Sequence, residues 1–264
     1  MKKFFSLVIC IMALLFAACT NNPNSNSKAK AFSVSSSKQV YFSPGNLQYH
    51  PANKKWRFAE RQTDYIGKAN GNISATYNGW IDLFGWGTGN VPTKSNIDYS
   101  YYQTFVDWGT NKIGNDAPNT WRTLTYDEWN YLLNNRNNAS SLYGVAQVNG
   151  VNGLIFLPDN WKCPSGVTFK SGFHSSYGVD YYAAYQTFTA EQWAKFEAAG
   201  AIFLPAAGYR NGWDVGGVQN YGEYWSATEF NSRFAYYLYF DSDGANVDYL
   251  NRGSGRCVRL VKDL

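Results

Sequence analysis

Few side chains in this sequence are spaced for catalysis. The two histidines, His50 and His174, lie in turn-like stretches without a partner nearby in the chain. Asp127 and Glu128 fall in the first turn of a predicted helix, where carboxylates complement the helix dipole. The sequence contains no Walker loop, dinucleotide-binding fingerprint, nucleophile elbow or zinc signature. We therefore expect a protein that is not an enzyme and that needs no cofactor and no metal.

Side chains suited to binding are concentrated near the C-terminus. Over residues 235–241 the two-residue period of a β-strand places Tyr236, Leu238 and Phe240 on one face. The other face then carries Tyr237, Tyr239 and Asp241. A strand with a core on one side only would bury the first set and expose the second, so these odd-numbered residues are expected to face solvent.

The stretch after this strand has the composition of a binding surface. Residues 241–256 are rich in Asp, Ser, Gly, Asn, Tyr and Arg, and antibody paratopes combine rigid Tyr rings with small adaptable polar groups in the same way. Many of these residue types also arise from an Asn codon by changes at adenines alone. The alternative is a polar hairpin with incidental tyrosines. The predicted ligand-binding residues, for a protein or glycan, are Tyr237, Tyr239, Asp241, Asn246, Asp248, Tyr249, Asn251 and Arg252.

Two helices are predicted from their N-terminal signals. Thr125 is followed three residues later by Glu128, and Thr189 is followed by Gln192; both patterns are capping boxes. Each helix carries a Trp four residues after its Thr, and the first runs to about residue 136. Gly200 is a suitable C-terminal cap for the second.

The remaining elements are predicted to be short strands. Residues 40–58 read as a hairpin around a Pro/Asn turn, and 224–228 and 235–241 read as strands. Asp243 and Gly244 mark a turn, and 258–261 form a closing strand in the central sheet. Short mixed or antiparallel strands, two helices and long loops indicate an α+β fold.

The N-terminus predicts export and lipidation. A basic start and a short apolar run ending in Ala-Ala-Cys resemble a lipoprotein signal peptide over residues 1–18, with Cys19 as the lipidated residue; the alternative is an ordinary signal peptide with an incidental cysteine. No Asp follows Cys19, which indicates the outer membrane and leaves the leaflet open. We expect a flexible tether over 19–38 and a domain over 39–264.

Net charge bears on the class of partner, and the cysteines bear on possible cross-links. Removing Lys2 and Lys3 from the 23 basic residues leaves 21 against 19 acidic residues. This near-neutral balance, without a basic patch, makes nucleic acid an unsuitable partner. Beyond the signal and Cys19, the remaining cysteines are Cys163 and Cys257. In an oxidising compartment they could form a disulfide, or they could be two separate buried thiols.

The order of several short motifs resembles a known family. These motifs are Trp121, Leu124-Thr125, Glu128-Trp129, Leu157-Pro158-Asp159, Trp161, Phe203 to Gly208, Arg210, Tyr224 to Thr228, Gly255 and Val258 to Val261. Over residues 40–264 the chain resembles the Fibrobacter succinogenes major paralogous domain of lipoproteins from gut Bacteroidetes. That group is similar in fold to C-type lectins and to formylglycine-generating enzymes, and the likeness is closest to the variable proteins of diversity-generating retroelements.

The resemblance implies a C-type-lectin-like fold and a surface-displayed binding protein. The calcium-site triplets Glu-Pro-Asn, Gln-Pro-Asp and Trp-Asn-Asp do not occur here, so calcium-mediated sugar binding is not expected. The alternatives are a structural or fimbria-like adhesive envelope lipoprotein, and a relative of the formylglycine-generating enzymes that would depend on Cys257.

Overall fold

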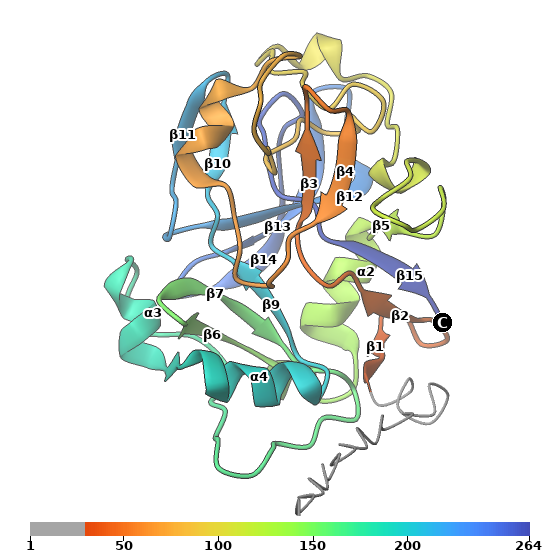
Figure 1. The fold of residues 1–264 in the computed structure, drawn as a ribbon. Helices are drawn as coiled ribbons and strands as arrows, with labels where there is room; N and C mark the ends of the chain where they lie inside the picture. The colour runs from red at the N-terminus through yellow and green to blue at the C-terminus, as the bar shows by residue number, and fades with distance from the viewer. Residues whose placement is uncertain (1–29) are drawn as a thin grey trace, which may run out of the picture.

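The computed structural model describes residues 30–264 (Figure 1). The predicted signal peptide and Cys19 lie outside the described residues. The chain is an α+β protein in which most regular structure is short strands, grouped in five small sheets with a few short helices around them. Within residues 30–264, no helix is long and apolar enough to cross a membrane.

One sheet joins the two ends of the described chain. Its order is β1 (Phe32–Ser33), β2 (Gln39–Phe42), β15 (Leu260–Asp263) and β5 (Arg122–Thr123), all antiparallel. The predicted closing strand is therefore confirmed. The predicted tether is wrong for residues 31–38, because Ala31, Phe32 and Val34 are buried and β1 pairs with β2. The few apolar side chains of this stretch pack into the core, although its Ser-rich composition had indicated a flexible segment.

A second sheet lies beside helix α4 (Ala190–Ala198) (Figure 1). Its strands, in spatial order, are β8 (Thr187–Phe188), β6 (Tyr143–Val148), β7 (Val151–Phe156) and β9 (Ile202–Pro205). Two hairpins complete the upper half: the predicted one, β3 (Leu47–His50) with β4 (Lys55–Phe58), and a second, β10 (Tyr209–Asn211) with β11 (Asp214–Gly216). Short 3-10 helices occur at Gly67–Asn72, Tyr99–Tyr101, Trp108–Thr110 and Ala139–Ser141.

Both predicted capping boxes are confirmed. Thr125 and Glu128 cap α2 (Tyr126–Asn130), which continues as a π-helical turn over Tyr131–Asn135. Thr189 and Gln192 cap α4 in the same way, and Gly200 follows that helix with a φ of 101°. A third helix that the sequence did not predict, α3 (Asp180–Tyr185), lies between them in the chain.

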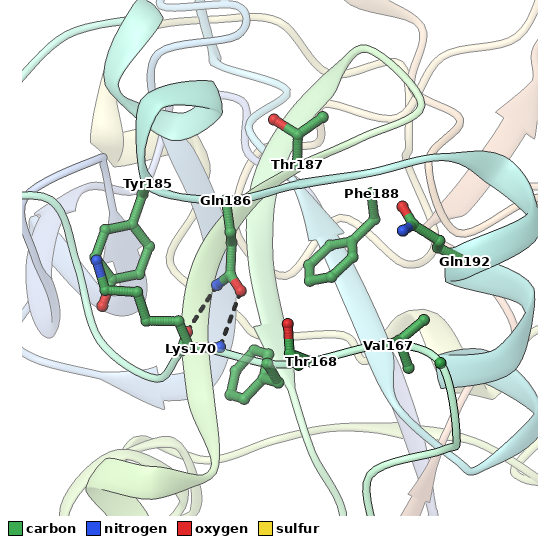
Figure 2. Close-up of a pocket in the computed structure, with 10 residues that line it drawn as sticks. Val167, Thr168, Lys170, Tyr185, Gln186, Thr187, Phe188 and Gln192 are labelled. Atoms are coloured by element: carbon green, nitrogen blue, oxygen red, sulfur yellow. Dashed lines mark hydrogen bonds between the residues drawn. The ribbon is translucent and has the colours of Figure 1, made fainter.

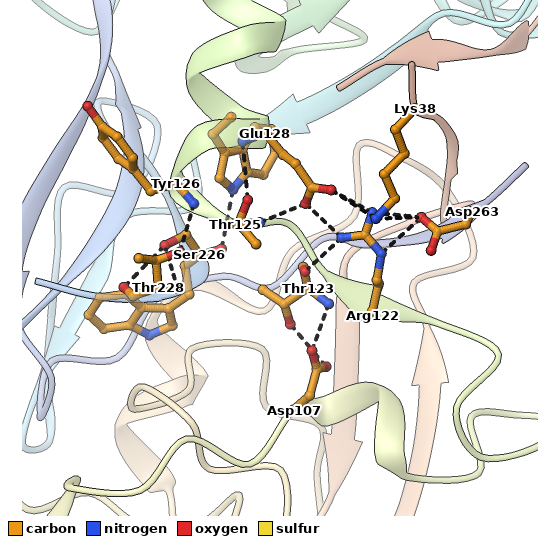
Figure 3. A network of polar contacts seen from close by, with 12 residues as sticks. Lys38, Asp107, Arg122, Thr123, Thr125, Tyr126, Glu128, Ser226, Thr228 and Asp263 are labelled. Atoms are coloured by element: carbon orange, nitrogen blue, oxygen red, sulfur yellow. Dashed lines mark hydrogen bonds and ion pairs between the residues drawn. The ribbon is translucent and has the colours of Figure 1, made fainter. Parts of the chain in front are cut away.

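A polar network ties α2 to the sheet of the chain ends (Figure 3). The Arg122 guanidinium donates to both oxygens of Glu128, at 2.7 and 2.8 Å, and to Asp263 at 2.7 Å. Lys38 adds an ion pair to each of these carboxylates. Burial alone would raise the pKa of Glu128, but the bonds from Arg122 and Thr125 hold it below its usual value. The capping carboxylate is therefore also the centre of a tertiary contact.

The third sheet carries the predicted binding residues. It is antiparallel, in the order β12 (Gly222–Glu229), β13 (Phe234–Phe240) and β14 (Ala245–Asn251). Asp243 and Gly244 form the predicted turn between its last two strands. Strand β13 lies between its two neighbours and packs against a different core on each face: Leu238 and Phe240 enter one apolar cluster, and Ala235 and Tyr237 enter another. The predicted one-sided strand is therefore wrong.

Candidate functional site

The predicted binding residues do not share one exposed face. Residues directly opposite each other in an antiparallel sheet lie on the same face. Tyr239 is opposite Asn246, and Tyr237 is opposite Asp248, so these four share a face, whereas Tyr249 is opposite Tyr236 on the other face. The structure thus divides the predicted set between the two sides of the β13–β14 hairpin.

Three of the predicted binding residues are buried and have structural roles. Tyr237 is 5% exposed, because its ring packs edge-on against Trp225 and over the guanidinium of Arg256. Burial raises the pKa of Tyr237 to about 12. The predicted exposure of Tyr237 is wrong because a second core lies on this side of the sheet.

Asp241 and Arg252 are the other two, and the expected exposure of Asp241 is wrong. Asp241 accepts hydrogen bonds from the backbone N–H groups of Asp243 and Gly244, at 2.9 and 3.1 Å, and so builds the hairpin turn. Arg252 is 1% exposed; its guanidinium donates to Glu229 and to backbone carbonyls and lies over the ring of Trp86. Both side chains therefore have structural partners within the described residues.

Tyr239 belongs instead to a cluster of four tyrosines, which we call the tyrosine surface. Its other members are Tyr177 before α3, Tyr209 on β10 and Tyr221 just before β12. The ring of Tyr221 is the centre, with centroids 5.9 Å from Tyr239, 5.9 Å from Tyr177 and 6.3 Å from Tyr209. Tyr177 is exposed and the other three are half-buried. Rings from four separate segments therefore form one patch that reaches solvent.

Hydrogen bonds hold the rings of this surface in place. The hydroxyl of Tyr177 donates to that of Tyr221, and the side-chain amide of Asn220 donates to Tyr177 at 2.6 Å. The hydroxyl of Tyr239 donates to Asp241 at 2.7 Å. The bond with Tyr177, together with partial burial, raises the pKa of Tyr221 to about 12, so this hydroxyl stays protonated at neutral pH. Pre-ordered rings of this kind lose little conformational entropy when they contact a partner.

Tyr249 and Asn251 lie on the far face of the hairpin, with different neighbours. The ring of Tyr249 stacks on Phe230 at 3.8 Å between centroids, packs at a tilt against Phe234 and meets Tyr236 edge-on. Asn251 accepts a hydrogen bond from the N–H of Gly253 at 2.8 Å. Tyr249 is 43% exposed, so this second aromatic patch reaches solvent on its own side of the sheet.

A separate groove lies between the segments 166–170 and 185–188, with Gln192 of α4 at its edge (Figure 2). Its volume is about 650 Å³, within the range of about 300–1,000 Å³ common for small-ligand sites. The Gln186 amide bonds both backbone groups of Lys170, and the Lys170 ammonium lies 3.8 Å above the ring of Tyr185. The residues that line the groove include no carboxylate, histidine or cysteine.

The two remaining cysteines are free thiols, so the predicted disulfide is wrong. Cys257 is buried beside β12, where its backbone pairs with Tyr224 and its thiol accepts a weak hydrogen bond from Asn46. Burial raises its pKa well above the usual value. Cys163 is exposed and donates to the carbonyl of Val167. A protonated buried thiol and a remote exposed one do not form a reactive pair. Within residues 30–264, no three His, Cys, Asp or Glu side chains gather as a metal site.

The sequence did not identify Tyr177, Tyr209 and Tyr221 as site residues. The chain has 21 tyrosines, and these three are separated by long stretches. The only signal that could have found them is the abundance of Tyr itself, because their proximity depends on how four segments fold together.

Comparison with known proteins finds one similarity. Residues 184–261 match a family described as a domain of unknown function (DUF8237). This stretch holds three of the four residues of the tyrosine surface, namely Tyr209, Tyr221 and Tyr239, together with the whole β12–β14 sheet. No curated protein and no solved structure matches the chain.

Proposed function

We propose that this chain is a non-catalytic binding lipoprotein, anchored in the outer membrane through Cys19 and displayed at the cell surface. Its domain is C-type-lectin-like, of the Fibrobacter succinogenes major paralogous type and similar to retroelement variable proteins. The order of the motifs from Trp121 to Val261 supports this assignment, as do the two capped helices and the terminal sheet that joins the ends of the domain.

The tyrosine surface is the observation that carries the proposed function. Three rings lie about 6 Å from the central ring of Tyr221. Held by hydrogen bonds and partly open to solvent, the four rings suit a rigid contact area for a protein or glycan. Asn246, opposite Tyr239 in the sheet, and Asp248 add exposed polar groups on the same face. Protein interfaces are enriched in Tyr because a ring supplies area with few rotatable bonds.

The proposed function is tested by binding arrays and point variants. The mature chain carrying Cys19→Ser is labelled and applied to arrays of glycans and of cell-surface proteins. Tyr239→Ala and Tyr221→Ala should each abolish binding to the targets found, at unchanged thermal stability or after correction for it. Tyr249→Ala is the matched control, because this tyrosine lies on the opposite face of the same hairpin. Binding that survives both substitutions, or that depends on Tyr249 instead, would refute the site.

Two further tests address the anchor and the diversification. A Cys19→Ser chain should move from the detergent phase to the aqueous phase on phase partition, whereas the unmodified chain should stay with detergent. A reverse-transcriptase gene and a near-copy of the 3′ end beside the gene would support a diversified C-terminal tract. Fimbrial genes in that position would favour the second candidate described next.

A structural or fimbria-like adhesive lipoprotein is the second candidate. The observation in its favour is strand β14, which among residues 30–264 pairs with β13 alone and so leaves a seven-residue edge. Such an edge can accept a strand from another chain. The relationship to formylglycine-generating enzymes is not supported by the site, because Cys257 is a buried thiol with a raised pKa and Cys163 does not accompany it.

A further inference from the structure

The two most exposed large apolar side chains in the described part of the chain lie together. Trp213 is 73% exposed and Ile97 is 60% exposed. Both line one cleft of about 620 Å³, which is formed by the tip of the β10–β11 hairpin and the loop 95–97. Single exposed apolar residues are common, but two of this size in one cleft mark a surface built for contact.

The backbone conformation of the β10–β11 turn places Trp213 at the hairpin tip. Asn211 pairs with Asp214 across a two-residue loop, and Gly212 at the first loop position has a φ of 61°, as a type II′ turn requires. This turn leaves Trp213 at the end of the hairpin. A Cβ on Gly212 would lie 3.6 Å from the side chain of Ile97, so the hairpin tip is in contact with the loop.

The loop itself is seated on Gly253, directly after strand β14. A Cβ at position 253 would come within 2.8 Å of the backbone oxygens of Asn96 and Ile97, so only a glycine allows this approach. The side-chain oxygen of Asn96 accepts from the N–H of Asp98 at 2.8 Å, which fixes the amide. Both walls of the cleft are therefore held by the fold.

The other side chains around the cleft are hydrogen-bonding groups of low charge. They are Ser95, Asn96, Asn211 and Asp214, and no Lys or Arg lines the cleft. Within residues 30–264, the side chains of Ser95, Asn211 and Asp214 make no hydrogen bond or ion pair. Their hydroxyl, amide and carboxylate groups supply both donors and acceptors. The Asp214 carboxylate would repel an anionic ligand, and the neighbouring Arg210 guanidinium is fully buried and already donates to the carbonyls of Gly212 and Leu83.

We propose that this cleft binds a neutral saccharide without calcium. A pyranose ring has an apolar C–H face, which would stack on the indole of Trp213 beside Ile97. Its rim of hydroxyls both donates and accepts, and so matches Asn96, Asn211 and Asp214. A lipid surface would favour basic residues around the ring, and a protein hot spot would favour a pocket closed to water. This site is separate from the tyrosine surface, which begins at Tyr209, at the other end of the same hairpin.

The test is calorimetric titration of the mature chain carrying Cys19→Ser, in the presence of EDTA. The probes are cello-, xylo-, manno- and maltohexaose, with polygalacturonate as the anionic comparison. At least one neutral hexasaccharide should bind, and Trp213→Ala should weaken it by at least about tenfold, or about 1.4 kcal/mol. Trp213→Phe should retain part of the affinity because a ring remains.

Control variants separate this site from the rest of the surface. Phe230→Ala removes another exposed ring, and Tyr239→Ala disrupts the tyrosine surface; both should leave saccharide affinity within about twofold. If Tyr239→Ala loses its array targets but keeps saccharide affinity, the tyrosine surface and the cleft are separate sites and the cleft proposal stands. If Trp213→Ala loses saccharide affinity but keeps the array targets, the tyrosine surface stands. Gly253→Ala should weaken saccharide binding by displacing the loop 95–97.

Several outcomes would overturn the proposal. These are failure of all four neutral hexasaccharides to bind, unchanged affinity in Trp213→Ala, and tighter binding of polygalacturonate. Sedimentation with phosphatidylcholine vesicles that is lost in Trp213→Ala would assign Trp213 to a membrane surface. Self-association that is lost in Trp213→Ala would assign it to a contact with a second copy of the chain.

Discussion

The ion pair between Glu223 and Arg256 is the most deeply buried one among residues 30–264. Arg256 Nε lies 2.8 Å from Glu223 Oε2, and the two side chains are 1% and 8% exposed. The guanidinium also lies against the rings of Trp225 and Tyr237, at 4.6 and 4.3 Å. Glu223 on β12 lies opposite Tyr239 on β13, so the two residues share a face of the sheet. Loss of the ion pair would therefore disturb the support of the tyrosine surface.

We predict that Glu223→Gln lowers the free energy of unfolding by about 3–5 kcal/mol, because it leaves a buried positive charge without a counter-charge. Arg256 Nη1 already has no hydrogen-bond partner within the described residues, so the rings of Trp225 and Tyr237 would be the charge's main remaining contacts. A loss of this size is a large fraction of the roughly 5–15 kcal/mol that stabilises a typical domain. Burial already raises the pKa of Glu223 against the attraction of Arg256, which shows how costly charge is at this position.

The measurement is urea unfolding of Glu223→Gln, Arg256→Met and the double variant. The double variant should be more stable than the sum of the two single losses predicts, because removing both partners leaves no unpaired charge. Arg256→Met alone should also be destabilising, since a lone carboxylate then stays buried. A loss below about 1 kcal/mol in Glu223→Gln, or strictly additive losses, would refute this reasoning, because surface pairs give values of that size.

Three further predictions concern residues that the structure relocates. In the native protein, Ellman's reagent should modify Cys163 at once and Cys257 only after unfolding, and reductant should leave the unfolding midpoint unchanged; a native protein without a reactive thiol would contradict this. Arg252→Met should lower stability by about 1–3 kcal/mol and leave array binding unchanged, whereas selective loss of binding would restore Arg252 as a contact. The raised pKa values of Tyr221 and Tyr237, both about 12, stabilise the fold fully below the ordinary tyrosine pKa near 10. This contribution is lost as the pH rises through 12. Ultraviolet absorbance should therefore detect tyrosines that ionise later than free tyrosine. Unfolding free energies that stay constant from pH 10 to 12 would contradict this prediction.

Local signals in the sequence predicted local structure well. The Thr125–Glu128 and Thr189–Gln192 capping boxes begin helices as expected, because the bonds that define them join residues three apart. Of the hairpin predicted at 40–58, the part over 47–58 is confirmed, whereas residues 39–42 pair with β1 and β15 in another sheet. The Asp243–Gly244 turn follows from the same kind of short-range chemistry as the confirmed hairpin. In the turn, Asp241 accepts from the two residues that follow it closely.

The exposure of strand 235–241 could not be predicted in this way. Alternation assigns residues to two faces, and it did so correctly, but it cannot say how many faces are covered. Tyr237 is buried because Trp225 on β12 and Arg256 from a later loop cover the face that was expected to be open. Likewise, Phe32 is buried because β2 and Asp159 bind the segment around it.

The sequence by itself determined the α+β class, the starts of two helices and the turn chemistry, since each depends on residues within one turn or one hairpin. Only the tertiary structure decided which polar and aromatic side chains can meet a partner. The tyrosine surface joins residues from 177 to 239, and the Trp213 cleft joins loop 95–97 to a hairpin more than a hundred residues later. Such sites arise from packing between distant segments, and burial of each side chain depends on what those segments cover.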